Sequence, residues 1–346
     1  MSLDEFNREL REKNLIGYWM IPIRSDDFRE PQASFEPFLW KWAEIYEALQ
    51  KAVNHIAPED AWRRFIGFQH PALKLGTCHT LLMGAQMIRP GEKAPAHRHT
   101  MEAIRFVVQG RGVYTTVEGE AFPMDEGDLI TTPNWTWHDH VSTGEGTVIW
   151  LDGANGPMIQ YFQTGFAELY HHAHQTITRP DGCSEHEYGF TRSVGTTPAT
   201  RTFRPPYRYR WEETRRALEL KSETPGDPYD GVLLRYVDPA TGAPTLPSMS
   251  CEIQMLRPRE QTRSHRHTHT VIYHAFRGSG STMIHGQRFD WEHGDSFVVP
   301  LWTWHSHANN SPEPAILFSI NDRPALEALG LHREETKKDA DTTSQS

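Results

Sequence analysis

Short apolar runs separated by turn residues dominate two stretches of the chain. Residues 103–117 (AIRFVVQGRGVYTTV) hold two β-rich runs joined by glycine-containing turn residues, a pattern typical of a hairpin. Residues 128–142 (DLITTPNWTWHDHVS) form a further β-rich run, which Pro133 interrupts. The same layout returns in residues 270–284 and 295–307. Short strands with closely spaced turns predict an all-β sandwich or barrel in each stretch.

Apolar residues at helical spacing lie outside these stretches, in residues 38–53 (FLWKWAEIYEALQKAV) and residues 211–221 (WEETRRALELK). A connector rich in Pro, Arg and Tyr (RPPYRYR) precedes the second of them and marks a junction between domains. The segment PALEALGL, which begins at Pro324, predicts a closing helix. The polar tail REETKKDADTTSQS has the composition of a disordered segment.

The two β-rich stretches are copies of one another. HRHTMEAIRF begins at His97, and HRHTHTVIYH begins 168 positions later at His265. WTWH ends at His138 in the first copy and 167 positions later at His305 in the second. Such a nearly constant offset indicates a duplicated domain. We therefore expect an N-terminal helical arm (1–70), a first β domain (71–180), a linker with a helix (181–230), a second β domain (231–331) and a disordered tail (332–346).

Composition and charge narrow the class of protein. The 346 residues are 37% hydrophobic, enough for two cores. The formal net charge is −10 with no long basic run, which argues against DNA or RNA as a partner. The three cysteines are far apart and form no CxxC pair, so a reducing, cytoplasmic location fits. The N-terminal segment MSLDEFNREL is unlike a signal peptide, and no apolar run approaches the roughly 20 residues of a membrane span.

The 20 histidines are the unusual feature of the composition. Because residues i and i+2 of a strand point to the same side, His97 and His99 would face one side together. His138, on a later strand, could supply a third ligand. Three neutral imidazoles with open positions suit a divalent transition metal such as Fe(II). An HxH pair can also be two exposed strand histidines, but two copies that are each followed by PxWTWHxH favour metal binding.

These motifs resemble a known family. RPGEKAPAHRHTMEAIRFVVQGRG is similar to the first cupin motif, and GDLITTPNWTWH is similar to the second. Two copies in one chain resemble an all-β bicupin, with two double-stranded β-helix (jelly-roll) barrels, an N-terminal helical arm and a few flanking helices. Over residues 35–331 the closer resemblance is to the gentisate 1,2-dioxygenase group, which includes salicylate and 1-hydroxy-2-naphthoate dioxygenases.

The sequence departs from the cupin motifs in two places. Ala103 and Val271 replace the usual metal-binding glutamate in the two copies, and strand alternation points the neighbouring Glu102 away from the histidines. Trp135 replaces the glycine of the second motif. A three-histidine site without a carboxylate ligand is therefore expected. This disfavours cupins of the oxalate decarboxylase and mannose isomerase types, whose sites use that glutamate.

The resemblance implies one Fe(II) ion per chain in the first copy and O2 as co-substrate. The neutral ligand set leaves the charge of Fe(II) uncompensated, and a 2-hydroxybenzoate could chelate the ion through its carboxylate and phenolate. The family opens the ring between C1 and C2, and its product from gentisate is maleylpyruvate. The expected protein is a gentisate 1,2-dioxygenase-like oxidoreductase that acts on a small aromatic acid and assembles as a homotetramer.

Two residues on the inner face of the first copy are candidates for binding this substrate. Arg105 is an even number of positions after His99, so a regular strand points it inward, where a guanidinium could hold the substrate carboxylate. A structural salt bridge is the alternative role for Arg105. His140 shares the face of His138, and the resemblance implies a role in substrate binding or proton handling. His140 could instead be a solvated edge histidine.

Further candidate site residues lie before and after these strands in the sequence. Gln86 matches a substrate-pocket glutamine of the family, and Asp152 matches an acidic residue near its active site. Both could equally be structural polar groups. Arg63 and Arg64, in AWRRFIGF, could reach the pocket from the N-terminal arm.

The second copy keeps His265, His267 and His305, which could hold a second metal ion. It has Tyr273 at the position that corresponds to Arg105, and Gln254 at the position that corresponds to Gln86. The second copy therefore lacks an obvious clamp for a carboxylate, and catalysis is expected only in the first. Two alternative functions stay open. One is a dioxygenase for salicylate, a substituted salicylate or 1-hydroxy-2-naphthoate, and the other is a non-catalytic, metal-binding bicupin.

Overall fold

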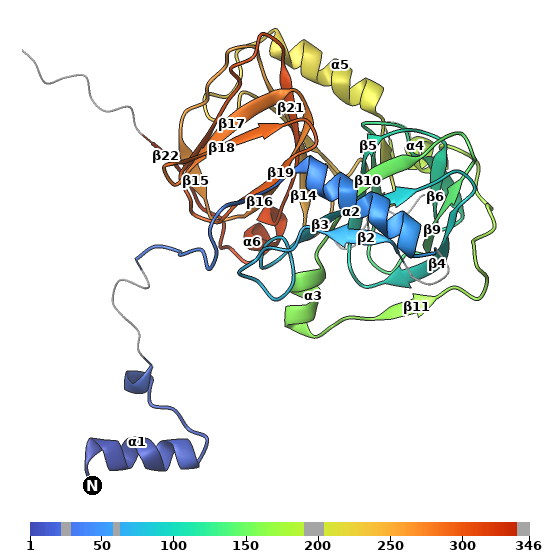
Figure 1. Ribbon diagram of the computed structural model, residues 1–346. Coiled ribbons are helices and arrows are strands. Elements are labelled where there is room, and N and C mark those ends of the chain that lie inside the picture. Colours follow the sequence, from blue (N-terminus) through green and yellow to red (C-terminus); the bar gives the residue numbers. More distant parts are fainter. Residues whose placement is uncertain (22–28, 58–62, 190–203, 338–346) are drawn as a thin grey trace, which may run out of the picture.

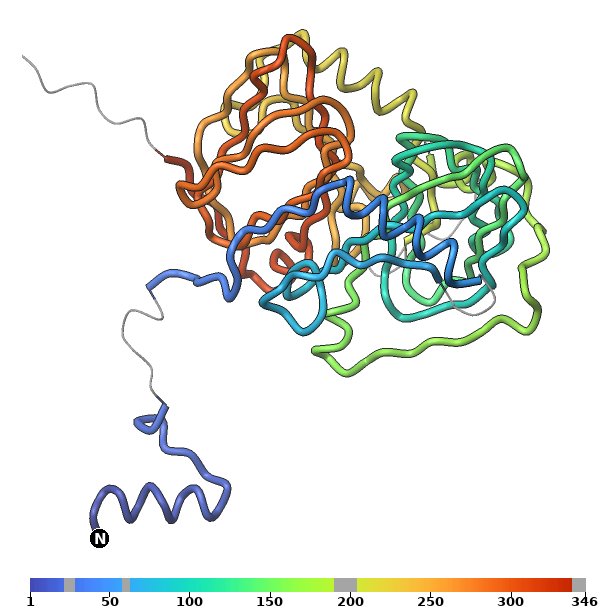
Figure 2. Tube along the Cα trace, in the orientation of Figure 1, coloured from blue at the N-terminus to red at the C-terminus, as the bar shows by residue number. Residues whose placement is uncertain are grey.

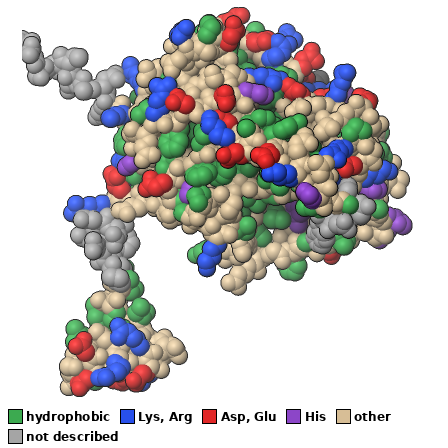
Figure 3. Space-filling model, in the orientation of Figure 1, with side chains coloured by type: hydrophobic (Ala, Val, Ile, Leu, Met, Phe, Trp, Pro, Cys, Tyr) green, Lys and Arg blue, Asp and Glu red, His purple; other side chains and the backbone are tan. Residues whose placement is uncertain are grey.

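The computed structural model describes residues 1–21, 29–57, 63–189 and 204–337. Figure 1 shows two β-barrels side by side, with the helix α1 (Leu3–Glu12) lying apart from them. The expected all-β, two-barrel architecture is confirmed by four antiparallel sheets. On the face drawn in Figure 3, basic and acidic side chains are interspersed, in keeping with the absence of a basic run in the sequence. Within the described ranges, no helix is long and apolar enough to cross a membrane.

The first barrel is a pair of sheets. A six-stranded sheet in the order β12-β8-β5-β10-β3-β2 packs with a five-stranded sheet in the order β11-β4-β9-β6-β7. The strands are β2 (Phe65–Gly67), β3 (Leu82–Ile88), β4 (Lys93–His99), β5 (Ala103–Gln109), β6 (Val113–Val117), β7 (Glu120–Pro123), β8 (Leu129–Thr132), β9 (His138–Ser142), β10 (Val148–Ala154), β11 (Ala167–Leu169) and β12 (Arg208–Tyr209).

The second barrel repeats this arrangement. Its six-stranded sheet has the order β1-β19-β16-β21-β14-β13, and its five-stranded sheet has the order β18-β17-β20-β15-β22. The strands are β1 (Phe38–Trp40), β13 (Val232–Tyr236), β14 (Ser250–Leu256), β15 (His265–His267), β16 (Val271–Arg277), β17 (Ser279–Ile284), β18 (Gln287–Glu292), β19 (Ser296–Val299), β20 (His305–Ala308), β21 (Ala315–Asn321) and β22 (Glu334–Thr336).

The helices flank the barrels or connect their strands. Beyond α1 they are α2 (Trp42–His55), α3 (Gly156–Phe162), α4 (Cys183–Tyr188), α5 (Trp211–Ser222) and α6 (Arg323–Ala328), with a 3-10 turn η1 at Tyr18–Met20. The helix predicted for residues 38–53 starts later than expected, because Phe38–Trp40 form β1. The helices predicted after Arg210 and near Pro324 are α5 and α6.

Each barrel contains one strand from the chain segment that leads into the other barrel. β1 precedes the first barrel in the chain but pairs with β19 of the second, while β12 precedes the second barrel but pairs with β8 of the first. In Figure 2 the chain after β1 crosses from one barrel to the other as α2. The arm and the linker, expected to be helical, thus each contribute a strand to a sheet. Both segments form strands because each pairs with an edge strand that is distant in the sequence.

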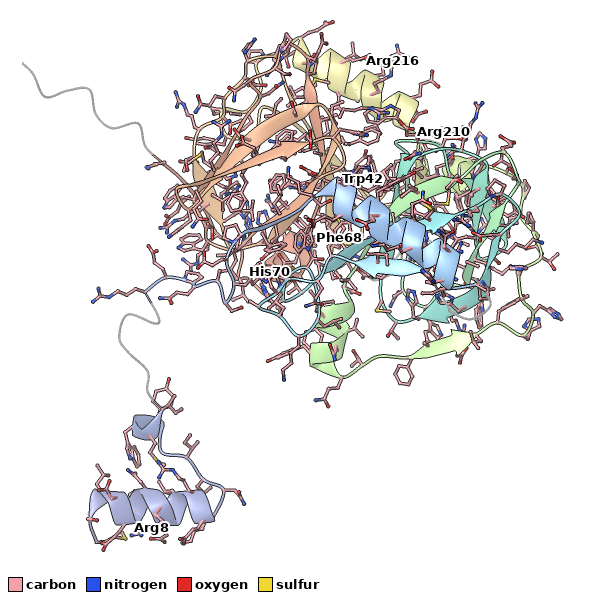
Figure 4. The ribbon with its side chains drawn as sticks, viewed as in Figure 1. Arg8, Trp42, Phe68, His70, Arg210 and Arg216 are labelled. Atoms are coloured by element: carbon pink, nitrogen blue, oxygen red, sulfur yellow. The ribbon has the colours of Figure 1, made fainter. Side chains whose placement is uncertain are left out.

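The helix that follows each of these strands is capped by an aspartate of the barrel with which that strand pairs. The backbone N–H of Trp42, at the start of α2, donates to Asp295 Oδ1 at 2.9 Å. The backbone N–H of Trp211, at the start of α5, donates to Asp128 Oδ1 at 2.8 Å. Figure 4 labels Trp42 at the beginning of α2, between the two barrels. A buried aspartate that accepts from the first turn of a helix is an N-cap-like contact, so the two barrels hold each other's helices.

The chain end belongs to the second barrel as far as residue 337. Disorder from residue 332 onward is the wrong expectation for Glu334–Thr336, because these residues form β22 along the strand His265–His267. In the first barrel β11 takes the same place beside β4. Arg98 pairs with Glu168 at 2.6 Å and Arg266 pairs with Glu335 at 2.7 Å, so the tail strand repeats β11. Residues 338–346 lie outside the described residues.

One apolar cluster of the described residues spans the two barrels, beside a separate cluster inside each barrel. The ring of Phe106 stacks on that of Phe318 with centroids 4.0 Å apart and meets the edge of Phe276 at 4.9 Å. All three side chains are fully buried. Burial of this apolar surface is a major favourable term in folding, so the barrels are expected to unfold together. The site described next therefore sits in a scaffold that both barrels support.

Candidate active site

Three histidines converge in the first barrel. His97 and His99 project from β4, and His138 of β9 is paired in register with His97. The ring centroids are 4.5 Å apart for His97 and His138, 4.9 Å for His99 and His138, and 5.4 Å for His97 and His99. One nitrogen of each ring lies within 4.8 Å of the others. The alternation of strand residues thus brings the predicted trio together.

Hydrogen bonds define which nitrogen of each ring is available. In all three, Nδ1 lies 2.9–3.3 Å from a backbone carbonyl two residues away in the chain. A carbonyl oxygen can only accept, so Nδ1 bears the proton and Nε2 has the free lone pair. A metal-binding histidine commonly donates its other N–H in this manner. The histidine set therefore fits a divalent metal ion.

The histidines are neutral at physiological pH. Burial, followed by the charge of Arg63, lowers the pKa of His97 to about 2. Burial lowers the pKa of His99 to about 4, and it holds the pKa of His138 well below the usual value. A metal ligand must be unprotonated, so these rings can bind a cation without first releasing a proton.

Arg105 is the centre of a buried polar network beside the histidines. Its Nε donates to Nε2 of His140 at 3.2 Å and lies 3.6 Å from Oδ1 of Asp152, and its Nη1 donates to Thr132 Oγ1. The side chain of Gln86 donates to the Asp152 carboxylate. Among the residues that the structure describes, Nη2 of Arg105 donates to no acceptor. One side of the guanidinium is therefore left for a ligand.

His140 carries its proton on the nitrogen away from Arg105. Because Nε2 accepts from Arg105, the proton of the neutral ring is on Nδ1, and no described residue accepts from that atom. Burial and the charge of Arg105 hold the pKa of His140 well below its usual value. The ring is buried and lies 4.9 Å from that of Trp150, so it is not the solvated edge histidine considered above.

The two neighbouring arginines of the arm have different surroundings. Arg63 is partly buried near the histidines and donates to the carbonyl of Pro95 at 2.9 Å, and burial followed by the charge of Arg105 lowers its pKa to about 9. Arg64 instead donates to both carboxylate oxygens of Glu92. The structure therefore brings Arg63, but not Arg64, to the network around the histidines.

Two members of the network were not anticipated from the sequence. Thr132 accepts from Arg105, and Trp150 donates through Nε1 to Asp152 at 3.2 Å. The signal for Trp150 was its place two positions before Asp152, which puts both side chains on one face of β10. Thr132 lies across from Ala103 on the neighbouring strand, a pairing that local sequence does not reveal.

Trp135, which replaces the glycine of the second cupin motif, has a backbone conformation that favours glycine. Trp135 has a φ of 60° and Trp302, its counterpart, has a φ of 54°, both in the left-handed region that favours glycine. The N–H of Trp135 donates to the carbonyl of His99 at 2.8 Å, which ties the turn to the histidine strand. Arg98 lies over the ring of Trp135 at 4.4 Å, a cation–π contact that helps to hold this turn.

The second barrel contains the other predicted histidine cluster. His265 and His305 have ring centroids 4.3 Å apart, and His267 lies 4.9 Å from His305. Their candidate ligand atoms also lie within 4.8 Å of one another. Tyr273 faces Ser319 at the positions where the first barrel has Arg105 and Asp152. The second cluster therefore lacks the ion pair of the first.

Two barrels that each join an HxH strand to a third histidine define a bicupin with two candidate metal centres. The family model described as a cupin domain matches residues 84–153 and 252–321. A 5-aminosalicylate 1,2-dioxygenase of a Comamonas species is 37% identical over 343 residues, which cover 96% of this chain and 90% of the relative. Gentisate 1,2-dioxygenase 1 of Aquipseudomonas alcaligenes is 37% identical over 333 residues, with 95% of both chains covered.

A solved structure agrees with these relatives. The crystal structure of salicylate 1,2-dioxygenase from Pseudoaminobacter salicylatoxidans with gentisate matches with a TM-score of 0.88 and 29% identity, over 97% of this chain and 94% of the other. The chain therefore belongs to the gentisate 1,2-dioxygenase family of bicupin ring-cleaving dioxygenases. It is an oxidoreductase of the gentisate and salicylate type, and its relatives act on small aromatic substrates.

Proposed function

We propose that this dioxygenase binds one Fe(II) through His97, His99 and His138 and opens gentisate between C1 and C2 with O2 to give maleylpyruvate. The observation that carries the proposal is a neutral three-histidine cluster next to the buried cation Arg105, with no carboxylate among the three ligands. Such a site favours a ligand that brings its own negative charge, as a 2-hydroxybenzoate does.

The residues of the network have distinct roles in this proposal. When bound, the ferrous ion supplies a path for electrons from an electron-rich ring to O2. The free side of Arg105 holds the substrate carboxylate and orients the ring. Asp152 fixes the rotation of Arg105 and offsets its charge, and Gln86 in turn orients Asp152. Arg63 adds positive charge near the histidines, and it is the arginine of the arm that we retain as a substrate residue.

His140 handles a proton in this scheme. It has one on Nδ1, where no described residue accepts it, and its Nε2 is held by Arg105. A neutral imidazole in this state can donate a hydrogen bond from Nδ1 to a substrate oxygen, and burial favours the neutral form of the ring. Arg64 has no role in this proposal, because its guanidinium is committed to Glu92.

A second candidate substrate is a 5-substituted salicylate. It is favoured by the relative named as a 5-aminosalicylate 1,2-dioxygenase, which is as similar to this chain as the gentisate enzyme is. An amino group at this ring position donates electrons as the gentisate hydroxyl does. Salicylate and 1-hydroxy-2-naphthoate lack that group, so we expect them to react more slowly. We also propose a homotetramer.

Oxygen uptake tests the proposal. Fe(II)-loaded protein is given gentisate, 5-aminosalicylate, salicylate and 1-hydroxy-2-naphthoate, and absorbance scans follow the ring-opened product. We expect the highest kcat/KM for gentisate, and the His99→Ala variant is the control without a complete metal site. A higher value for another acid would replace gentisate as the substrate. Uptake with none of the acids would favour a non-catalytic bicupin.

A further inference from the structure

The cluster in the second barrel is surrounded by more acidic residues than the first. Arg105 and Arg63 lie near the first histidines, whereas the second histidines border a cavity of about 50 Å³ that is also lined by Asp230, Glu252 and Glu334. Two arginines line it as well, Arg235 and Arg323, which pair with Glu252 and Glu327. A cavity needs about 10–15 Å³ of such space to hold one water, so this one has room for an ion and a few waters.

Asp230 lies within the range of a shared ligand. Its Oδ1 is 3.8 Å from Nε2 of His265. Nitrogen and carboxylate ligands bind transition metals at about 2.0–2.2 Å, so two ligand atoms on one ion are separated by about 3–4.2 Å, depending on the angle between them. The observed separation falls inside this range. Asp230 comes from the segment that enters β13, and the cupin glutamate position on β16 is occupied by Val271.

Two of the three histidines have an unprotonated Nε2. His267 donates from Nδ1 to the carbonyl of His269 at 2.8 Å, and His305 donates from Nδ1 to that of Thr303 at 2.9 Å. Their Nε2 atoms are therefore unprotonated. Nε2 of His305 is buried without a hydrogen-bond partner among the described residues, on a side chain that is only 1% exposed. A buried acceptor left without a partner is costly, and a cation would satisfy it.

The carboxylate of Asp230 is also without compensation. Glu252 of the same cavity pairs with Arg235 at 2.8 Å, but no described lysine or arginine pairs with Asp230. Asp230 is partly buried, with its side chain 21% exposed, and a carboxylate in such surroundings, next to neutral imidazoles, is stabilised by a nearby cation. A divalent metal ion would provide the missing charge at this position.

We infer that the second barrel holds its own divalent metal ion through His265, His267, His305 and Asp230. This set of three nitrogens and one carboxylate oxygen suits Zn²⁺ in tetrahedral coordination. The anionic ligand that the first site must take from its substrate is here part of the chain. The ion joins β15, β20 and the segment before β13, so it stabilises the folded barrel and has no part in ring cleavage.

Zinc binding in a protein with a disabled first site is the direct test. The His99→Ala variant, stripped with chelator and dialysed against Zn²⁺, is expected to retain one zinc ion per chain. Adding Asp230→Asn should weaken zinc binding at least tenfold. Adding Glu334→Gln instead removes the same charge from the rim of the same cavity and should weaken it much less. No retained zinc in His99→Ala, or equal losses in the two double variants, would overturn the inference.

A spectroscopic variant separates ligation from general electrostatics. In His99→Ala/Asp230→Cys loaded with Co²⁺, direct ligation predicts the intense near-ultraviolet band of a thiolate bound to cobalt. The corresponding Glu334→Cys protein should lack that band. Circular dichroism of both stripped proteins checks that they are folded. A folded Asp230→Cys protein that binds Co²⁺ without the band would show that residue 230 is not a ligand. None of these measurements depends on turnover.

Discussion

Arg105 and Asp152 face each other across the antiparallel strands β5 and β10, with Nε and Oδ1 3.6 Å apart, while the same two positions in the second barrel are Tyr273 and Ser319. Both members of the charged pair are buried. A buried ion pair is seldom worth its desolvation cost in stability alone. Since the duplicated scaffold folds with an uncharged pair in the other barrel, we attribute the ion pair to substrate binding and not to the fold.

The Arg105→Gln variant tests that attribution. It should keep its metal ion, because the three histidines do not hydrogen-bond to Arg105. Losing a charge-assisted hydrogen bond of about 1.5–3 kcal/mol predicts a fall in kcat/KM of about 10- to 150-fold. Steady-state oxygen uptake and metal analysis measure the two effects. Tyr273→Phe, at the same position of the second barrel, is the control and should leave kcat/KM unchanged. Unaltered efficiency in Arg105→Gln would mean that the carboxylate is held elsewhere.

Strand alternation was enough to anticipate much of the candidate site. The spacing of His97, His99 and Arg105 puts all three on one face of successive strands, and the repeat of the motifs predicts the second cluster. The pattern could not distinguish Arg63 from Arg64, because both precede β2, which begins at Phe65, so strand alternation does not apply to them. Only the ion pair of Arg64 with Glu92 assigns that side chain to the structure of the arm.

The exchanged strands could not be predicted from local pattern. β1 pairs with β19 some 260 positions away, at Phe38 opposite Val298, and nothing within a short window of sequence reports such a partner. The tail strand β22 is held by its pairing with the sheet edge and by the ion pair with Arg266. It packs no apolar face, so its sequence is polar and gives no strand pattern. A signal was present, since Glu335 follows Glu168 by the same 167 positions as His305 follows His138.

The strained turn at Trp135 predicts an unusual order of stabilities. A non-glycine residue in the left-handed region costs about 1–2 kcal/mol, and both Trp135→Ala and Trp135→Gly lose the contact with Arg98. Only glycine also relieves the strain. The glycine variant should therefore be more stable than the alanine variant by about 1 kcal/mol, the reverse of the usual order. Urea unfolding of the two proteins measures the difference. An alanine variant as stable as the glycine variant would show that the turn is not strained.

Asp295 is expected to connect the stability of the two barrels. It accepts from the N–H of Trp42 and pairs with Lys41 at 2.6 Å, although its own side chain is buried in the second barrel. Loss of a helix cap costs about 0.5–2 kcal/mol, so Asp295→Ala should lower the free energy of unfolding by at least this much. Because the core is shared, thermal unfolding should stay a single transition. The exposed Asp290, which pairs with Arg288, provides the control variant Asp290→Ala. An equal change in the two variants would contradict the capping role.

His274 gives the last prediction, on pH. It is fully buried on β16 near Trp42, Nδ1 bonds to Ser296 Oγ at 3.0 Å, and Nε2 has no partner among the described residues. Burial, followed by the neighbouring His293, lowers its pKa to about 3. The unfolded chain, with a pKa of about 6.5, therefore binds one more proton between these two values. This contribution to stability is complete above about pH 6.5 and is lost as the pH falls.

Replacing His274 with glutamine should remove this difference in bound protons between the unfolded and folded states. The slope of unfolding free energy against pH should become shallower by up to about 1.4 kcal/mol per pH unit between about pH 4 and 6. Urea unfolding of the chelator-treated protein at several pH values measures the slope. The other buried histidines titrate in both proteins, so the difference isolates position 274. His55→Gln, at an exposed position of α2, is the control and should leave the slope unchanged. If His274→Gln also had the wild-type slope, His274 would have to be protonated within the folded barrel, and some group would have to accept from its Nε2.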